Sequence, residues 1–269
     1  MLTLNNTQLE VQVLDPVADQ RRFGTRYCTG GYIFQIVDPT HGPLLTGPTY
    51  PDSFNVFDGQ GIPDAFNLAP LRGDGADALI LGIGMCDLAA NVVREFCTWN
   101  IDHSGDALSF RTHHEYRDWR VELLREIRLA GRTVRSTTTL RSTGRAPVPM
   151  RWFPHPFYPQ TSDDELVWFN TAIDFDQNAP GYAHAASGFL RRRNGPWTEG
   201  HYLPLSHDAT APLTVLQRHP QLGLAAASCS YAPDFFPVWG NPRTFSWEPF
   251  LERTVAPGQS YAWHIDYHF

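Results

Sequence analysis

His155 is the residue of this chain whose surroundings most suggest chemistry. It lies in the stretch RWFPHPFYPQ (residues 151–160), between Pro154 and Pro156 and among aromatic side chains. Pro154 fixes the backbone angle φ just before the histidine and Pro156 biases His155 towards an extended backbone, so the chain largely sets the direction of the imidazole. Because histidine titrates near neutral pH, a histidine held in this way could transfer a proton. The alternative is a core histidine with satisfied hydrogen bonds.

Other groupings of histidines are less suited to a metal. His264 and His268 are four residues apart, which on a strand separates them by roughly 13 Å, too far for one ion. His113 and His114 point to opposite faces if their segment is a strand. His113 could share a face with Glu115, and a polar sheet face is the competing interpretation.

Familiar catalytic and cofactor motifs do not occur in the sequence. It has no G-x-S-x-G elbow, and its four cysteines form no C-x-x-C pair. GDGADALILGIG (residues 73–84) lacks the spacing of a dinucleotide fingerprint. DFDQN (residues 174–178) begins with calcium-loop spacing but lacks the required glycine and the final glutamate. We therefore expect neither a cofactor nor a metal.

The basic residues and the net charge of the chain exclude several kinds of chemistry and argue against nucleic acid as a partner. All 21 basic residues are arginine, and the formal net charge is −7. The absence of lysine excludes lysine Schiff bases and the phosphate-loop lysine. The acidic balance argues against nucleic acid, which needs a basic face, and the one basic cluster, RRR at 191–193, is either a solvated loop or an anion site.

The ends and apolar runs of the chain give no sign of a membrane segment. The first 15 residues lack the basic start and apolar run of a signal peptide, and ALILGIGM (residues 78–85) is too short to span a bilayer. We expect a cytoplasmic protein without a membrane partner.

The sequence predicts that the elements that position His155 are β-strands. Prolines and glycines, 22 and 21 of them, separate short segments, as is typical of an all-β protein. Apolar and charged residues alternate over 119–129, Ala130-Gly131 turns the chain, and 133–140 returns as a partner strand. Residues 260–269 alternate in the same way and predict a closing strand.

One segment fits two structures. DLAANVVREFCTWN (residues 87–100) begins with an aspartate that could cap a helix and places Leu88, Val92 and Phe96 at helical spacing, whereas its neighbours indicate strands. No linker, composition shift or internal repeat divides the chain. We therefore expect residues 1–269 to form a single domain.

Two landmarks resemble the aldose 1-epimerases, also called galactose mutarotases, together with their hexose-phosphate relatives. The first, TLRSTGRAPVPMRWFPHPFYP (residues 139–159), is similar to the family's strand, N-x-G-like turn, small and proline residues, and HPYF. The second, VWGNPRTFSWEPF (residues 238–250) with LERTVAPGQSYAWHIDYHF after it, is similar to the family's EPW, leucine, PG turn and closing strand. Order and separation agree with the family from about residue 119 to 269.

The resemblance implies a supersandwich of antiparallel sheets and a cofactor-free enzyme that interconverts the α and β anomers of a hexose or hexose phosphate. Ring opening delivers a proton to the ring oxygen and removes one from the anomeric hydroxyl, which calls for an acid and a base on opposite sides of the C1–O5 unit. By the resemblance, His155 is the acid and Glu248 the base. Glu248 is held between Trp247 and Pro249, where nearby aromatic rings could raise its pKa by desolvation.

The N-terminal half departs from the family. NVFDGQGIPDAFN (residues 55–67) resembles the GG-I-P stretch of the hexose-phosphate branch, but LILGIGMCD (residues 79–87) has no histidine where the sugar-binding HG motif would fall. His113 or His114 could substitute for it from another strand.

Three further side chains are candidate sugar ligands. Arg26 and Arg72 could each bind hydroxyls or a phosphate, because a guanidinium can bind either bidentately. Trp239 could supply the aromatic face on which a sugar stacks. The partner expected is a small-molecule sugar. Two rival functions are a carbohydrate-binding protein without catalysis on the same scaffold, and a polysaccharide-processing or structural β-sandwich.

Overall fold

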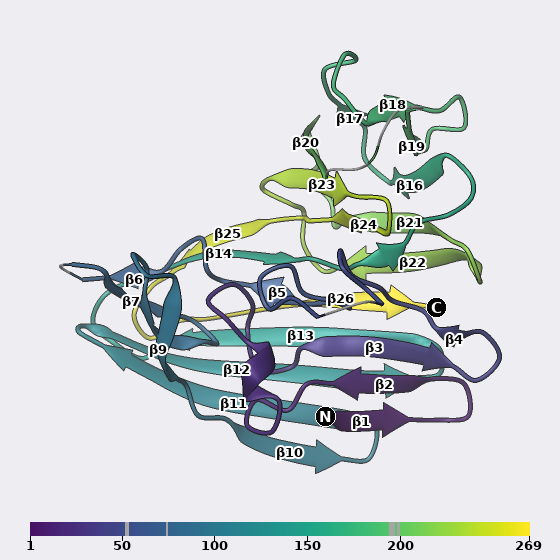
Figure 1. The fold of residues 1–269 in the computed structure, drawn as a ribbon. Helices are drawn as coiled ribbons and strands as arrows, with labels where there is room; N and C mark the ends of the chain where they lie inside the picture. Colours follow the sequence, from purple (N-terminus) through teal and green to yellow (C-terminus); the bar gives the residue numbers. More distant parts are fainter. Residues whose placement is uncertain (52–53, 74, 194–196, 198–199) are drawn as a thin grey trace.

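The protein is built almost wholly of antiparallel β-strands. The computed structural model describes residues 1–51, 54–73, 75–193, 197 and 200–269. Within these ranges the strands form five sheets, and the one helical element is a 3-10 turn, η1 (Gln20–Arg22) (Figure 1). The all-β prediction is confirmed. In the same ranges, no helix is long and apolar enough to cross a membrane.

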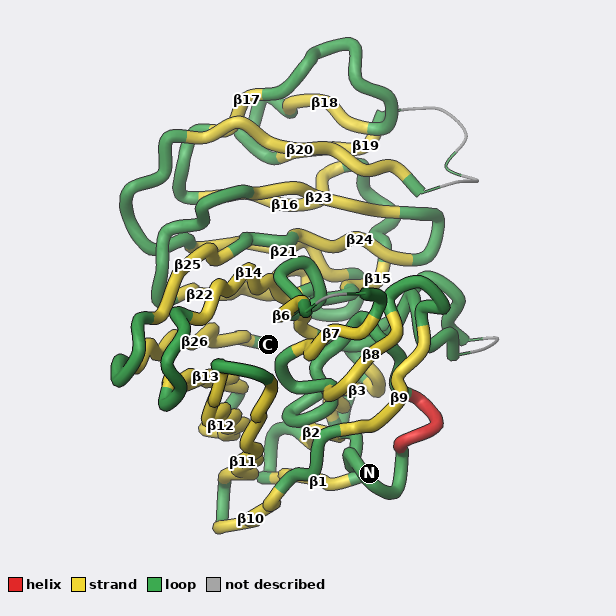
Figure 2. The backbone as a smooth tube through the Cα atoms, turned by 90° about the vertical axis from the view of Figure 1, so that its left-hand side faces the viewer, coloured by secondary structure: helices red, strands yellow, loops and turns green. Residues whose placement is uncertain are grey.

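The largest sheet of the described chain extends from β18 at the top of Figure 2 to β10 at the bottom. Its strand order is β10-β11-β12-β13-β26-β22-β21-β16-β19-β18. The bounds of these strands are β10 (Asn100–Ser104), β11 (Ala107–Tyr116), β12 (Trp119–Ala130), β13 (Thr133–Ser142), β16 (Glu165–Phe169), β18 (Tyr182–His184), β19 (Leu190–Arg192), β21 (Thr214–His219), β22 (Gly223–Cys229) and β26 (Ser260–His268).

The predicted hairpin lies at the centre of this sheet. β12 and β13 pair in register up to Ala130↔Thr133, and Gly131 makes the turn at a φ of 58°. Every second residue of β12 from Val121 to Leu129 is buried, as the alternation predicts, but one of these buried residues is Arg125. The predicted closing strand is β26, which lies between β13 and β22.

Two smaller sheets pack on the large one, in the orders β25-β14-β5 and β15-β24-β23-β20-β17. Aromatic side chains fill the layer between: the rings of Trp152 (β14) and Trp263 (β26) are 5.3 Å apart, and those of Phe169 (β16) and Phe236 (β23) 4.6 Å. The strand bounds are β5 (Asp64–Ala65), β14 (Val148–Pro154), β15 (Tyr158–Pro159), β17 (Ile173–Asp174), β20 (His201–His207), β23 (Phe236–Gly240), β24 (Thr244–Trp247) and β25 (Leu251–Val255).

The two remaining sheets come from the N-terminal part of the chain. Their strands are β1 (Leu2–Asn5), β2 (Glu10–Val13), β3 (Ile33–Asp38) and β4 (Gly42–Pro43) in one, and β6 (Leu71–Arg72), β7 (Asp77–Ile80), β8 (Gly84–Asp87) and β9 (Val92–Phe96) in the other. The ambiguous segment 87–100 is therefore strand and turn. The Asp87 carboxylate accepts the amides of Ala89 and Ala90, so it closes the turn before β9 and does not begin a helix.

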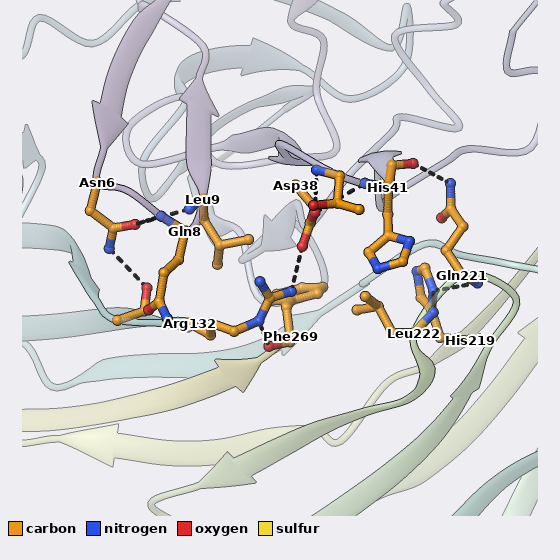
Figure 3. Close-up of polar contacts among 12 residues, drawn as sticks. Asn6, Gln8, Leu9, Asp38, His41, Arg132, His219, Gln221, Leu222 and Phe269 are labelled. Atoms are coloured by element: carbon orange, nitrogen blue, oxygen red, sulfur yellow. Dashed lines mark hydrogen bonds and ion pairs between the residues drawn. The ribbon is translucent and has the colours of Figure 1, made fainter.

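Polar contacts fasten the first sheet to the large one (Figure 3). Arg132, just after the hairpin turn, pairs with Asp38 at 2.7 Å and donates to the carbonyl of Phe269. Gln221 donates to the carbonyl of His41 at 3.0 Å. These contacts hold β3 and β4 beside the chain terminus, and β4 leads directly into the segment that carries Pro48 to the cavity described below.

Candidate active site

The backbone of His155 is held by the chain segment before β5. His155 follows the last residue of β14, and its amide donates to the carbonyl of Pro63 at 2.8 Å. Proline has no amide hydrogen, so within the segment 154–156 only His155 can donate a backbone hydrogen bond. The position of His155 is thus set by strand pairing as well as by its two prolines.

Aromatic rings surround the imidazole and exclude water from it. Phe157 stacks on the ring with centroids 4.3 Å apart, and Trp239 and Tyr27 approach it edge-on at 6.2 and 6.3 Å. His155 is consequently only 3% exposed. A ring packed on several sides has little freedom to turn, which favours proton transfer in a fixed direction.

Both polar partners of His155 come from one end of β24. Ser246 and Glu248 are two residues apart, so the alternation of an extended chain places their side chains on the same side. The Ser246 hydroxyl lies 2.8 Å from Nδ1 of His155, and Oε1 of Glu248 lies 3.3 Å from Nε2. Each ring nitrogen therefore has its own buried partner.

The contact between His155 and Glu248 bears on how the pair would reach a sugar. The expectation places the acid and the base on opposite sides of the reacting C1–O5 unit, and in the structure the two side chains touch each other. Adjacency is compatible with the same chemistry, because the ring oxygen and the anomeric hydroxyl are both bonded to C1. A neighbouring pair of groups can reach both oxygens from one side of the sugar.

Burial decides where the protons of this pair reside. It raises the pKa of Glu248 to about 8, opposed by the nearby charge of Arg26. It lowers the pKa of His155 well below its ordinary value, and Arg26 acts in the same direction. Both shifts favour uncharged groups, because a low-dielectric interior solvates charge poorly. Near neutral pH the free pair therefore consists of a protonated carboxyl and a neutral imidazole.

The pair opens onto a cavity of about 240 Å³. This is below the roughly 300–1,000 Å³ of pockets for drug-sized ligands, and it suits a molecule as small as a monosaccharide. The cavity is lined by Arg26, Pro48, Phe57, Asp58, His155, Phe157, Tyr202, Trp239 and Glu248.

The residues that line the cavity come from distant parts of the chain. Trp239 on β23 and Tyr202 on β20 are register partners and form an aromatic wall. From the N-terminal part of the chain, the Arg26 guanidinium lies 5.0 Å from the ring centre of Tyr27 and 4.8 Å from that of Phe57, and it donates to the Phe57 carbonyl at 3.1 Å. Aromatic faces beside hydrogen-bonding groups are suited to a sugar, which has apolar faces and a polar edge.

Arg72 and His113 lie elsewhere. Arg72 is exposed on the short strand β6, and His113 is exposed on β11, opposite Glu122 of β12. Neither is among the residues that line the cavity. Its neighbour His114 faces the core, where Nε2 accepts the amide of Gly82 at 2.9 Å and burial lowers its pKa to about 4. Of the predicted site residues, the fold brings together Arg26, His155, Trp239 and Glu248.

Several residues of the cavity, and Ser246 behind His155, were not found from the sequence. Phe57 and Asp58 lie within the stretch 55–67 that resembles the hexose-phosphate branch, but neither was singled out as a ligand, and Tyr202 is one of many aromatic residues. Ser246 carried a usable signal, because a residue two places before Glu248 on a strand must share its face. Among the residues that the structure describes, no group of three or more histidine, cysteine or acidic side chains could hold a metal ion.

Comparison with solved structures identifies the fold. A galactose mutarotase related enzyme from Lactobacillus acidophilus superposes with a TM-score of 0.65 at 11% identity, covering 99% of this chain and 96% of that one. A protein from Escherichia coli K12, provisionally named as an aldose 1-epimerase, gives 0.60 at 15% identity with 99% and 97% covered. This chain has the galactose mutarotase-like fold.

A galactose mutarotase-like protein from Lactobacillus casei supports the same conclusion, with a TM-score of 0.58 at 12% identity and 100% and 99% of the two chains covered. Scans of the sequence against protein-family models and curated proteins found no match. The fold predicted from the resemblance is confirmed. At such identities similarity extends to the fold, and the chemistry has to be argued from the site itself.

Proposed function

We propose that this protein is a cofactor-free aldose 1-epimerase, interconverting the α and β anomers of a small sugar. The observation that carries the proposal is the buried contact between His155 and Glu248 on the wall of a monosaccharide-sized cavity. Ring opening requires a general acid and a general base, and two titratable side chains that touch each other and are shielded from water can supply both.

The proton steps balance within this pair. The proton that burial leaves on Glu248 passes to Nε2 of His155 across the 3.3 Å contact. His155 then protonates the ring oxygen while Glu248 takes the proton of the anomeric hydroxyl, and the C1–O5 bond breaks to give the open-chain aldehyde. This step leaves His155 neutral and Glu248 protonated, the state that burial favours. Rotation of the aldehyde and the reverse transfers close the ring to the other anomer.

Magnetisation-exchange NMR between the anomers of a panel of aldoses tests this function. The wild-type protein should accelerate exchange for at least one sugar. His155→Asn and Glu248→Gln should each reduce the acceleration at least about 100-fold, in the range expected for loss of general acid–base catalysis. Circular dichroism checks that both variants fold. Full activity in either folded variant would contradict the assigned roles.

One observation favours a second candidate, a carbohydrate-binding protein without catalysis. Among the described residues that line the cavity, His155 is the single histidine, so the wall lacks a second histidine to contact sugar hydroxyls. Saturation-transfer NMR separates the two functions. Binding of an aldose without any acceleration of its anomer exchange would establish the binding protein.

A further inference from the structure

The charges on the cavity wall indicate which sugars can enter. Among the described residues that line the cavity, the charged side chains are one cation, Arg26, and two carboxyl groups, those of Asp58 and Glu248. Glu248 is occupied with His155, which leaves Arg26 and Asp58 as the charged groups available to the rest of the sugar. One guanidinium and one carboxylate on the same wall give this part of the site opposite charges that balance.

Asp58 is held in place through its backbone. The hydroxyl of Tyr27 donates to the Asp58 carbonyl at 3.1 Å, and the Asp58 amide lies 3.4 Å from the Asn55 side-chain oxygen. Within the described part of the chain, no hydrogen bond or ion pair occupies the Asp58 carboxylate, and the residue is half-buried at the cavity. Its oxygens are therefore free to accept hydrogen bonds from a ligand.

Arg26 is less available to an anion than an isolated arginine. Its guanidinium lies against the rings of Tyr27 and Phe57, and one of its nitrogens already donates to the Phe57 carbonyl. The remaining N–H groups can still donate at the cavity. Arg26 thus supplies donors next to the acceptors of Asp58.

A donor beside an acceptor matches a hydroxyl group and mismatches a phosphate. A hydroxyl both donates and accepts, so neighbouring sugar hydroxyls can satisfy Arg26 and Asp58 together. A phosphate monoester carries about −1.5 to −2 charges at neutral pH and offers mainly acceptor oxygens. In this cavity a phosphate would leave the Asp58 carboxylate without a hydrogen-bond donor and would be repelled by its charge. The Arg26 guanidinium is already engaged with Phe57, so it offsets this repulsion poorly.

We propose that the site takes an uncharged aldose, and that Asp58 is the residue that excludes sugar phosphates. This inference rests on the proposed function, since it concerns the sugar bound beside His155 and Glu248. It chooses between the neutral and the phosphorylated hexoses that the sequence alone left open.

The test compares neutral and phosphorylated forms of the same sugars. Anomer exchange and equilibrium binding are measured for glucose, galactose and their 6-phosphates, using wild-type protein, Asp58→Asn and Asp208→Asn. Asp208 is an exposed aspartate beyond the end of β20 and is not among the residues that line the cavity, so its variant controls for the change in net charge.

We expect wild-type protein to favour a neutral sugar over its 6-phosphate by at least about tenfold in kcat/KM and in affinity, because like charges in one site cost at least that much. Asp58→Asn should reduce this ratio several-fold by improving the phosphate, whereas Asp208→Asn should leave it unchanged. Equal or better use of the 6-phosphate would overturn the inference. A ratio that Asp58→Asn does not alter would remove Asp58 from the explanation.

The binding arm separates this inference from the proposed function. If no sugar shows accelerated exchange, mutarotation fails, but neutral sugars that bind while their 6-phosphates do not would still support exclusion by Asp58. If the protein accelerates anomer exchange of the 6-phosphates more than that of the neutral sugars, the proposed mutarotation stands and the inference about Asp58 fails. If neither class binds, both fail.

Discussion

Glu248 links the chemistry of the site to the stability of the protein. Its pKa is about 8 in the folded chain and 4.5 as an ordinary carboxyl. Between these values the folded state holds the proton more tightly than the unfolded state. The stability that the protonated group contributes is therefore complete below about pH 4.5 and is lost as the pH rises through about 8.

Replacement of Glu248 by glutamine isolates this effect. Glutamine resembles the protonated carboxyl and does not titrate, so Glu248→Gln should gain stability over wild-type protein as the pH rises from 5 to 9. The gain should be about 1.4 kcal/mol per unit of pH while the pKa values of the two states bracket the pH, and a few kcal/mol in all. Urea unfolding at a series of pH values measures it. A stability difference that is independent of pH would mean that Glu248 is not buried as an acid.

Ser246 is placed to select which nitrogen of His155 is available for chemistry. A neutral imidazole accepts at one nitrogen and donates at the other. If the Ser246 oxygen accepts from Nδ1, 2.8 Å away, Nε2 is left to receive the proton of Glu248. Ser246→Ala removes that preference, so we expect kcat to fall about tenfold with KM within about twofold, since the lost hydrogen bond is worth about 1–2 kcal/mol and does not touch the sugar.

The tautomer itself is visible by NMR. The nitrogen-15 shifts of His155 should indicate a proton on Nδ1 in wild-type protein and a mixture of tautomers in Ser246→Ala. Ser142→Ala is the matched control, because Ser142 is another fully buried serine and its hydroxyl has no hydrogen-bond partner among the residues that the structure describes. If Ser246→Ala lowers kcat while the tautomer is unchanged, or if Ser142→Ala lowers it equally, Ser246 acts only through packing.

At the scale of elements, strand periodicity was the information that the sequence held most clearly. It predicted the β12–β13 hairpin and β26, because each has one face in the core and one towards solvent. It left residues 87–100 ambiguous. Apolar residues at helical spacing can also lie in a turn followed by a short strand. An aspartate side chain such as that of Asp87 can close a turn as well as cap a helix, so the sequence alone does not separate the two structures.

Arg125 shows what periodicity could not supply. It occupies a core position on β12 and is 1% exposed, where its guanidinium contacts the Asp64 carboxylate and the Thr138 hydroxyl. Asp64 belongs to β5, which pairs with the end of β14 beside His155. An arginine on an apolar face can be recognised from the sequence, but its partner lies 61 residues away and becomes evident only from the fold. This buried pair ties the large sheet to the strands that position the candidate acid.

For the whole molecule, the candidate site exists only when distant parts of the chain assemble. Arg26 and Asp58 come from the N-terminal segments, whereas His155, Trp239 and Glu248 follow or belong to strands far along the chain. One hydrophobic core cluster contains residues from all five sheets, including Leu4, Leu71, Leu123, Trp152 and Trp247. The motifs around His155 and Glu248 could be read from sequence because each is local. Asp58 could not, because its proposed role follows from lining one cavity with residues nearly two hundred positions away.

This assembly predicts that residues 1–269 unfold as one cooperative unit and that a neutral aldose stabilises the entire unit. At a concentration of 100 times Kd, binding should add about 2.7 kcal/mol, which for a chain of this size raises Tm by about 5 °C or more. Differential scanning calorimetry measures both effects. Sorbitol at the same concentration is the control, because sugars and polyols also stabilise proteins by exclusion from their surface. Two separate transitions, or a sugar that raises only one of them, would show that the site belongs to part of the chain and that the single-domain expectation is wrong.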